Sequence, residues 1–196
     1  MNLPYSPACE QNKRVIYAAI DEHLGQHVLE IGAGTGQHAV YFARKRQDLI
    51  WQTSDLAIHL PAIVERIKQS GLSNLPPPVL LDVLGAWPVW HYDTVFSANC
   101  LHIMDEPMVE ACLRRVGEAL PPGGRLLVYG PFNYGGNYTA PSNQRFDQML
   151  RSRNPDSGIK DFEWLNGLAV QVDLQLLDDI EMPENNRTII WQKRTL

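Results

Sequence analysis

The chain has 196 residues, of which 44% are hydrophobic and 20% are charged, and its formal net charge is −5 at pH 7. This composition is ordinary for a soluble globular protein, and the length allows one domain with a sizeable core. The acidic balance argues against a general nucleic-acid binder, because such a protein needs a basic face to neutralise phosphates.

The sequence also argues against membrane, disulfide and metal classes. No apolar run reaches the ~18 residues of a membrane span, and the first residues lack the basic start and apolar block of a signal peptide. The three cysteines include no Cys-x-x-Cys pair, which favours a reducing cytoplasm over a disulfide framework. The six histidines are scattered, without metal-ligand spacing. We therefore expect a cytoplasmic protein that binds neither membrane nor nucleic acid and holds no metal.

The first predicted element is a helix over residues 7–24. Ser6-Pro7 supplies a capping hydroxyl followed by proline at the first helical position, and Gly25 stops the helix. The segment before it, 3–6, has no periodicity, and its Tyr5 is expected to pack on the surface unless it covers a ligand.

A glycine-rich turn follows, between a predicted strand at 27–31 and a helix at 37–46. It contains Glu30 and then Gly32, Gly34 and Gly36 in a Gly-x-Gly-x-Gly spacing. Glycines adopt positive φ without strain and let a ligand lie against bare main chain. Gln37 stands where a dinucleotide fingerprint wants a small residue, and the Gly-Lys-Ser/Thr of a phosphate-binding loop is absent.

Acidic residues end the next two predicted strands, at 49–53 and 79–81, which flank a helix at 58–70. Asp55 stands where a carboxylate can accept hydrogen bonds from both ribose hydroxyls of a nucleoside. The alternative role of Asp55 is to cap the following helix. Asp82, which is followed by Val83, has the alternative role of capping a turn before Gly85.

A fourth strand is predicted at 92–97, followed by Asn99 and His102. A histidine with an unperturbed pKa near 6.5 can accept a proton from an incoming nucleophile. The alternative for His102 is packing against the start of the next helix, predicted at 106–120. Pro121–Gly124 stops that helix, and a fifth strand is predicted at 125–129.

The least regular stretch is the loop 130–138 after this strand. A loop of this kind, at the edge of the sheet where the strands end, is suited to bind the substrate that accepts a transferred group. Phe132, Tyr134 and Tyr138 offer flat apolar surfaces for such an acceptor. Helices are predicted at 142–150, with Phe146, Met149 and Leu150 facing inward, and at 161–168.

Two closely linked strands, predicted at 174–180 and 188–193, end the chain. They must be antiparallel, because a parallel pair needs a crossover connection. This argues against a nicotinamide dehydrogenase, whose domain continues with strand-helix units. Asn185 in the connection is either a turn residue or a polar pocket residue.

These features resemble, in order, the class I S-adenosylmethionine-dependent methyltransferases. The resemblance is carried by the glycine turn, the two acids, the Asn99…His102 segment, the Pro122-Gly123-Gly124 turn and the terminal hairpin. The segments 3–10, 30–41, 51–55 and 183–186 also resemble a small uncharacterised bacterial family of methyltransferase-like proteins with an animal relative.

The resemblance implies an α/β, Rossmann-like fold: a seven-stranded, mostly parallel sheet with an antiparallel C-terminal hairpin and helices on both faces. S-adenosylmethionine would lie across the carboxyl edge of the sheet. Asp82 would bind the adenine amine, the Val83 N–H a ring nitrogen, and Asn99 the methionine part. The cofactor-binding set that we expect is Tyr5, Glu30, Gly32, Gly34, Gly36, Asp55, Asp82, Val83 and Asn99.

We therefore expect a single domain, 1–196, with an N-terminal helix and lid at 1–25 and an acceptor-side insertion at 131–160. The expected activity is methyl transfer to O or N of a small aromatic or heterocyclic acceptor by a monomer or homodimer. His102 or Tyr134 would accept the proton, and Phe132, Tyr138 and Asn185 would contact the acceptor. The alternative is a non-catalytic adenosylmethionine-binding partner or sensor.

Overall fold

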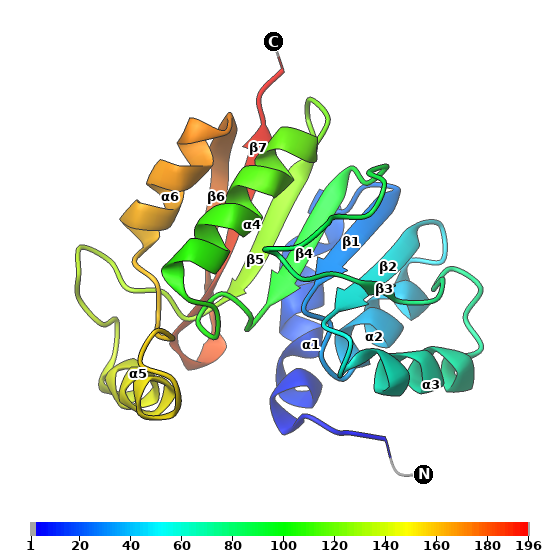
Figure 1. Cartoon of the computed structure of the whole chain (residues 1–196), viewed down its shortest axis with the longest axis horizontal. Coiled ribbons are helices and arrows are strands. Elements are labelled where there is room, and N and C mark those ends of the chain that lie inside the picture. The colour runs from blue at the N-terminus through cyan, green and yellow to red at the C-terminus, as the bar shows by residue number, and fades with distance from the viewer. Residues whose placement is uncertain (1–2, 196) are drawn as a thin grey trace. The chain divides into compact units, whose positions relative to one another are not determined.

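The structure is a computed structural model that describes residues 3–195. The chain folds into two compact units, Met1–Ser97 and Ala98–Leu196. Hydrogen bonding orders the strands β3-β2-β1-β4-β5-β7-β6 in a seven-stranded sheet (Figure 1).

Unit 1 consists of parallel strands and three α-helices. Its strands are β1 (His27–Ile31), β2 (Ile50–Asp55), β3 (Val79–Leu80) and β4 (Thr94–Ala98), whose last residue belongs to unit 2. Its helices are α1 (Pro7–Ile20), extended by the 3-10 turn η1 (Asp21–His23), α2 (Gln37–Lys45) and α3 (Leu60–Ser70). Strand β1 pairs in parallel with both β2 and β4, and β2 pairs in parallel with β3.

The core of unit 1 is aromatic. Phe42 of α2 lies 5.2 Å from Trp51 of β2 and 5.5 Å from Phe96 of β4, measured between ring centroids. All three side chains are fully buried. Burying this much aromatic surface stabilises the unit and packs α2 against β2 and β4.

Unit 2 contains an antiparallel sheet and three helices. Its strands are β5 (Arg125–Gly130), β6 (Leu174–Met182) and β7 (Asn186–Lys193), and the 3-10 turn η2 (Pro183–Asn185) joins the last two. Its helices are α4 (Glu106–Ala119), α5 (Pro141–Arg153) and α6 (Phe162–Gln171). Strand β7 pairs antiparallel with β5 on one side and with β6 on the other. Figure 1 shows α4 beside α6 in this unit.

The predicted fold class is confirmed, including the antiparallel C-terminal hairpin. Every predicted helix and strand is present, with ends that differ by up to four residues. The predicted buried face of α5 was wrong for Met149, which is 38% exposed, and it omitted Asn143 and Asp147, which are buried. These two polar side chains can be buried because backbone groups of neighbouring turns satisfy them: Asn143 donates to the Asn185 carbonyl, and Asp147 accepts from the Ile159 N–H.

Candidate functional site

The glycine turn after β1 has the backbone that its sequence predicts. Gly32, Gly34 and Gly36 have φ values of 73°, 56° and 71°, in the left-handed region that favours glycine. Gly34 is exposed, and a Cβ built on it meets nothing within 4 Å. The turn therefore presents bare backbone beside open space at the start of α2, which is suited to a ligand that approaches main chain.

Asp55 lies beside this turn. One carboxylate oxygen accepts a 2.6 Å hydrogen bond from the Gly34 N–H, and the other accepts a 2.7 Å bond from the Leu56 N–H. The Asp55 side chain therefore holds the glycine turn and does not cap α3, which begins at Leu60. A carboxylate has about four acceptor positions, so two remain for the hydroxyls of a ribose.

The segment before α1 is tied to the same turn. The Ser6 N–H donates to Gln37 Oε1 at 2.7 Å, and Gln37 Nε2 donates to the Ser6 carbonyl at 3.3 Å. The Arg66 guanidinium donates to the carbonyls of Thr35 and Pro4. Tyr5, between these anchored residues, is 62% exposed. These bonds hold the segment before α1 against the glycine turn. That Tyr5 contacts the cofactor stays a prediction.

Glu30 belongs to the interior of unit 1. Its side chain is 2% exposed and accepts a 2.8 Å hydrogen bond from the indole N–H of Trp51. Burial raises the pKa of this carboxyl to about 7, and the charge of nearby Asp55 adds to the rise. These contacts favour a structural role for Glu30 over direct contact with a ligand.

Asp82 combines the two roles that the sequence left open. Its Oδ1 accepts a 3.0 Å hydrogen bond from the Leu84 N–H, and its carbonyl accepts one from the Gly85 N–H, so it caps the turn after β3. The side chain is exposed, which leaves carboxylate lone pairs for an amine donor. Val83 is buried, and its carbonyl accepts from the Trp87 indole.

In unit 2 the structure brings Asn99 and His102 together. Asn99 has a φ of 56° and its N–H donates to the Tyr129 carbonyl at 2.9 Å. A Cβ built on Gly130, the last residue of β5, would lie 3.8 Å from His102 Nδ1 and 3.9 Å from Asn99 Oδ1. Asn99 and His102 therefore both lie at the end of this strand.

His102 is buried, with 6% of its surface exposed, and its ring stands edge-to-face to Phe146 at 5.1 Å. Burial lowers the pKa of the imidazole to about 4, and the charge of Lys160 contributes. His102 is therefore neutral at pH 7 and carries a lone pair that can accept a proton.

The aromatic residues of the loop after β5 lie in three different environments. Phe132 is 2% exposed, so its ring lies in the interior, and its contact with an acceptor stays a prediction. Tyr134 stacks on Phe162 at 5.2 Å and donates its hydroxyl to Asp179 at 2.8 Å. Tyr138 is 38% exposed and donates its hydroxyl to Asp147 at 2.8 Å.

The environment of Tyr134 disfavours the proton-accepting role that the sequence allowed. Burial raises the pKa of the phenol, and the hydrogen bond to Asp179 raises it further. A phenol that is neutral and donates to a carboxylate is a poor base. Arg187 holds Asp179 through a 2.8 Å ion pair, so Asp179 is itself fixed in place.

Asn185 is a turn residue. Its φ is 56°, its carbonyl accepts from Asn143 Nδ2 at 3.0 Å, and its side chain donates to Ser142 Oγ at 3.3 Å. These contacts tie η2 to the start of α5.

Among residues 3–195, no group of three or more His, Cys, Asp or Glu side chains is placed to hold a metal ion, and no helix there combines the length and apolar character needed to cross a membrane.

Sequence reasoning did not identify three residues whose contacts support the candidate site: Gln37 beside the glycine turn, and Phe146 and Asp147 of α5. Gln37 has the only local signal, because it replaces a small residue at the end of a glycine motif. Phe146 was expected to face inward without a partner, and it contacts His102. Asp147 gave no signal, since its contacts are with segments distant in the sequence.

The chain is similar to one described protein family and to several known proteins. Residues 3–193 match the model of a family described as "Protein of unknown function (DUF938)". Over 130 residues, the chain is 26% identical to "Methyltransferase GfsG" of Streptomyces halstedii, covering 64% of this chain and 45% of that protein. It is also 33% identical over 132 residues to "Highly reducing polyketide synthase 2" of Gibberella zeae, covering 59% of this chain and 5% of the synthase.

Solved structures share the fold at low sequence identity. An O-methyltransferase family protein from Burkholderia thailandensis has a TM-score of 0.85 and 17% identity, over 96% of this chain and 57% of that one. Human N-acetylserotonin methyltransferase, solved in complex with S-adenosylmethionine, has a TM-score of 0.83 and 15% identity, over 96% of this chain and 53% of the human chain. The chain thus spans about half the length of these proteins.

The expected fold, and the narrower resemblance to an uncharacterised family, are confirmed by these matches; the animal relative stays a prediction. The chain has the fold of the class I S-adenosylmethionine-dependent methyltransferases and belongs to the DUF938 family of proteins of unknown function.

Proposed function

We propose that this protein transfers a methyl group from S-adenosylmethionine to O or N of a small, flat acceptor. The observation that carries the proposal is the Asp55 carboxylate, buried at the end of β2 and bonded to the Gly34 N–H of an open glycine turn. The methyltransferase relative and the adenosylmethionine-bound human neighbour support the same cofactor.

The residues present in unit 1 fit a nucleoside. Asp55 has two free acceptor positions for a ribose, and the exposed Gly34 offers backbone without a side chain. Asp82 offers carboxylate lone pairs to an exocyclic amine. In this proposal Gly32, Gly34 and Gly36 line the ligand, and Val83 and Asn99 complete its polar contacts.

The cofactor supplies a methyl group that its sulfonium already activates. The protein must therefore hold the nucleophile in line with the methyl group and exclude water. His102 is the proposed proton acceptor for a hydroxyl or protonated amine, because its imidazole is neutral and lies at the end of β5 beside Gly130. A neutral heterocyclic nitrogen needs no base.

Tyr138 is the proposed contact for a flat acceptor, since part of its ring is exposed and its hydroxyl is fixed by Asp147. Asn185 is a second proposed polar contact, through the turn that carries it. The small-molecule acceptor, the cytoplasmic location and a monomeric or homodimeric state remain parts of the same proposal.

Two measurements test the function. Isothermal titration calorimetry with S-adenosylhomocysteine is expected to show binding to the wild-type protein, and no binding would overturn the proposal. Radiolabelled S-adenosylmethionine, incubated with the protein and a metabolite extract, is expected to yield a labelled small molecule. Binding without transfer to any fraction would indicate the alternative, a non-catalytic adenosylmethionine-binding partner or sensor.

A further inference from the structure

The loop that carries His102 is held by a short segment between α5 and α6. This segment, Ser157–Lys160, is called the strap below. All four of its residues are buried, although it contains no helix or strand. Buried irregular backbone needs hydrogen-bond partners, and the strap finds them on the His102 loop.

Three consecutive carbonyls of the His102 loop each accept one hydrogen bond from the strap. The Gly158 N–H donates to the His102 carbonyl at 2.9 Å. Ser157 Oγ donates to the Ile103 carbonyl at 2.7 Å. Lys160 Nζ donates to the Met104 carbonyl at 2.8 Å. A backbone N–H, a hydroxyl and an ammonium of the strap thus bind three consecutive carbonyls of the loop, and these bonds fix its main chain immediately before α4.

The strap is itself anchored by Asp147 of α5. The Ile159 N–H donates to Asp147 Oδ1 at 2.6 Å, and Arg151 Nε donates to Asp147 Oδ2 at 2.8 Å. Gly158 has a φ of 148°, and a Cβ on it would lie 2.4 Å from Arg151 Nη2 and 2.8 Å from Asp147 Oδ1. The backbone conformation and the nearby Asp147 carboxylate therefore favour glycine at this position.

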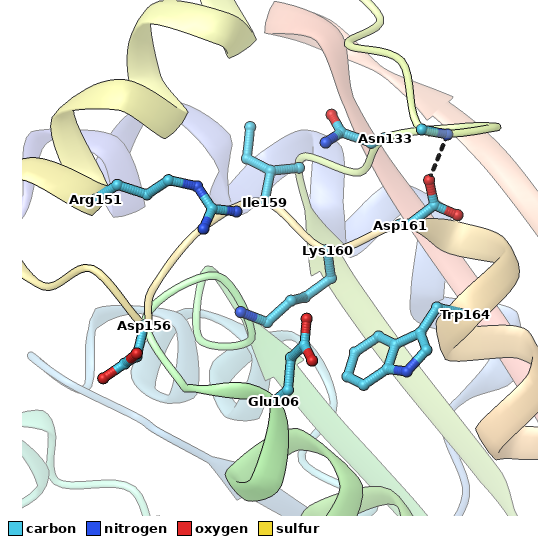
Figure 2. Close-up of a pocket in the computed structure, with 9 residues that line it drawn as sticks. Glu106, Asn133, Arg151, Asp156, Ile159, Lys160, Asp161 and Trp164 are labelled. Atoms are coloured by element: carbon cyan, nitrogen blue, oxygen red, sulfur yellow. Dashed lines mark hydrogen bonds between the residues drawn. The ribbon is translucent and has the colours of Figure 1, made fainter.

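Lys160 is the charged end of the strap. Its side chain is 6% exposed, and its ammonium also donates to the Gly158 carbonyl at 3.1 Å. Lys160 and Glu106 both line a pocket of about 260 Å³ (Figure 2). An ammonium has three donors, and the bonds to the Met104 and Gly158 carbonyls use two of them.

We propose that the strap positions the proton acceptor of this enzyme, with Lys160 as the positioning residue for His102. This inference rests on the proposed role of His102. Lys160 fixes the main chain of the His102 loop through its bond to the Met104 carbonyl. Its positive charge also lowers the pKa of the imidazole, so the ring is unprotonated when the acceptor binds. In this role Lys160 acts through His102 and touches no reacting atom.

The charges around this pair come from three segments. Lys160 is the charged group that lowers the pKa of His102, after burial. Four charged groups act on Lys160 itself: Glu106, Arg151, Asp105 and Asp147. Removing the Lys160 charge is therefore expected to raise the pKa of His102.

The test is an NMR titration of the His102 ring in the full chain, which needs neither cofactor nor acceptor. Wild-type protein is expected to titrate near pH 4. In Lys160→Met the apparent pKa of His102 is expected to rise measurably above the wild-type value, and in Lys160→Arg, which keeps the charge, it is expected to stay near the wild-type value. Ser157→Ala removes the hydrogen bond from the strap to the Ile103 carbonyl but no charge. The pKa of His102 in this variant should therefore also stay near the wild-type value, while the amide of Gly158 exchanges faster with solvent.

Lys193→Met is the matched control. Lys193 also donates its ammonium to a carbonyl, that of Val172 at 2.7 Å, but it lies where β7 meets the first residues of β5, whereas His102 lies at the last residue of β5. This variant is expected to leave the His102 titration unchanged. An unchanged pKa in Lys160→Met, or equal shifts in Lys160→Met and Lys193→Met, would overturn the inference. If Lys160→Met does not fold, an unchanged Gly158 exchange rate in Ser157→Ala would overturn it. Failure of methyl transfer alone would overturn the proposed function and leave these titrations interpretable.

Discussion

The Gly34 backbone N–H donates a 2.6 Å hydrogen bond to the carboxylate of Asp55, although the two residues are 21 positions apart. This bond sets the glycine turn and the acid side by side before any ligand arrives. A preorganised site avoids the free-energy cost of ordering these groups on binding.

Asp55→Asn is therefore expected to weaken binding of S-adenosylhomocysteine by about 10-fold to 100-fold, since it removes charge-assisted hydrogen bonds to a ribose. The amide keeps one acceptor oxygen for Gly34, so the fold should survive. Calorimetry measures the affinity. Asp48→Asn is the matched control, because Asp48 is an exposed acid of the same unit that pairs with Arg46, and it should bind like wild type. Equal affinities of Asp55→Asn and wild type would remove Asp55 from the site.

Glu30 makes the stability of the protein depend on pH. Its folded-state pKa is about 7, above the ordinary value of 4.5, so the folded state retains a proton that the unfolded state has lost between these values. The free energy of unfolding should therefore be highest, for this group, below pH 4.5 and fall as the pH rises to about 7.

Glu30→Gln keeps an acceptor for the Trp51 indole and removes the charge. It is expected to be more stable than wild type at pH 8, by up to about 3 kcal/mol, with a difference that shrinks below pH 5. Urea unfolding at several pH values measures this. A difference that is the same at pH 5 and pH 8 would show that the Glu30 carboxyl is not protonated in the folded state.

His102 predicts the acid limb of the activity profile. Because burial and Lys160 lower its pKa to about 4, the imidazole should be neutral and active throughout pH 5–8, with kcat/KM falling only toward pH 4. His102→Gln should lower kcat by about 100-fold or more on an acceptor that must lose a proton, with little change in the affinity for S-adenosylhomocysteine. An acid limb near pH 6.5, or full turnover by His102→Gln, would exclude this role.

The sequence predicts the fold because each strand and helix has a local signal. The apolar run before Glu30, the glycines after it, Ser6-Pro7 and Gly123 each mark an element end through their own backbone chemistry. The close spacing of the last two strands predicts their antiparallel pairing for the same reason. Asp55 could be predicted as part of the candidate site because it lies at the end of a strand, where its carboxylate can accept hydrogen bonds from a ribose.

The acceptor side could not be predicted in this way, because its contacts join distant residues. Phe132 and Tyr138 look alike in sequence, yet tertiary packing buries the first and exposes the second. The bond between Ser157 and Ile103 joins residues 54 positions apart, and nothing near either residue announces the other. The Trp51 indole reaches Glu30 because the strand register pairs Trp51 with Val28, and Val28 and Glu30 lie two residues apart on the same face of β1. Register is a property of the whole sheet, so a local stretch of sequence does not reveal this bond.

Two glycines inside helices offer a matched test of the packing in unit 2. Gly117 lies in α4, and a Cβ on it would lie 2.3 Å from Cγ2 and 2.5 Å from Cβ of Val172, at the end of α6. Gly167 lies in α6, and a Cβ on it would meet nothing within 4 Å.

Gly117→Ala is therefore expected to destabilise the protein by about 1–3 kcal/mol, because Val172 is β-branched and the helices must move apart. Gly167→Ala is expected to stabilise it by up to about 1 kcal/mol through better helix propensity alone. Both substitutions gain the same intrinsic propensity, so the difference between the two urea midpoints measures the close approach of α4 to the end of α6. If Gly117→Ala is as stable as Gly167→Ala, the two helices do not approach each other in solution as they do in this structure.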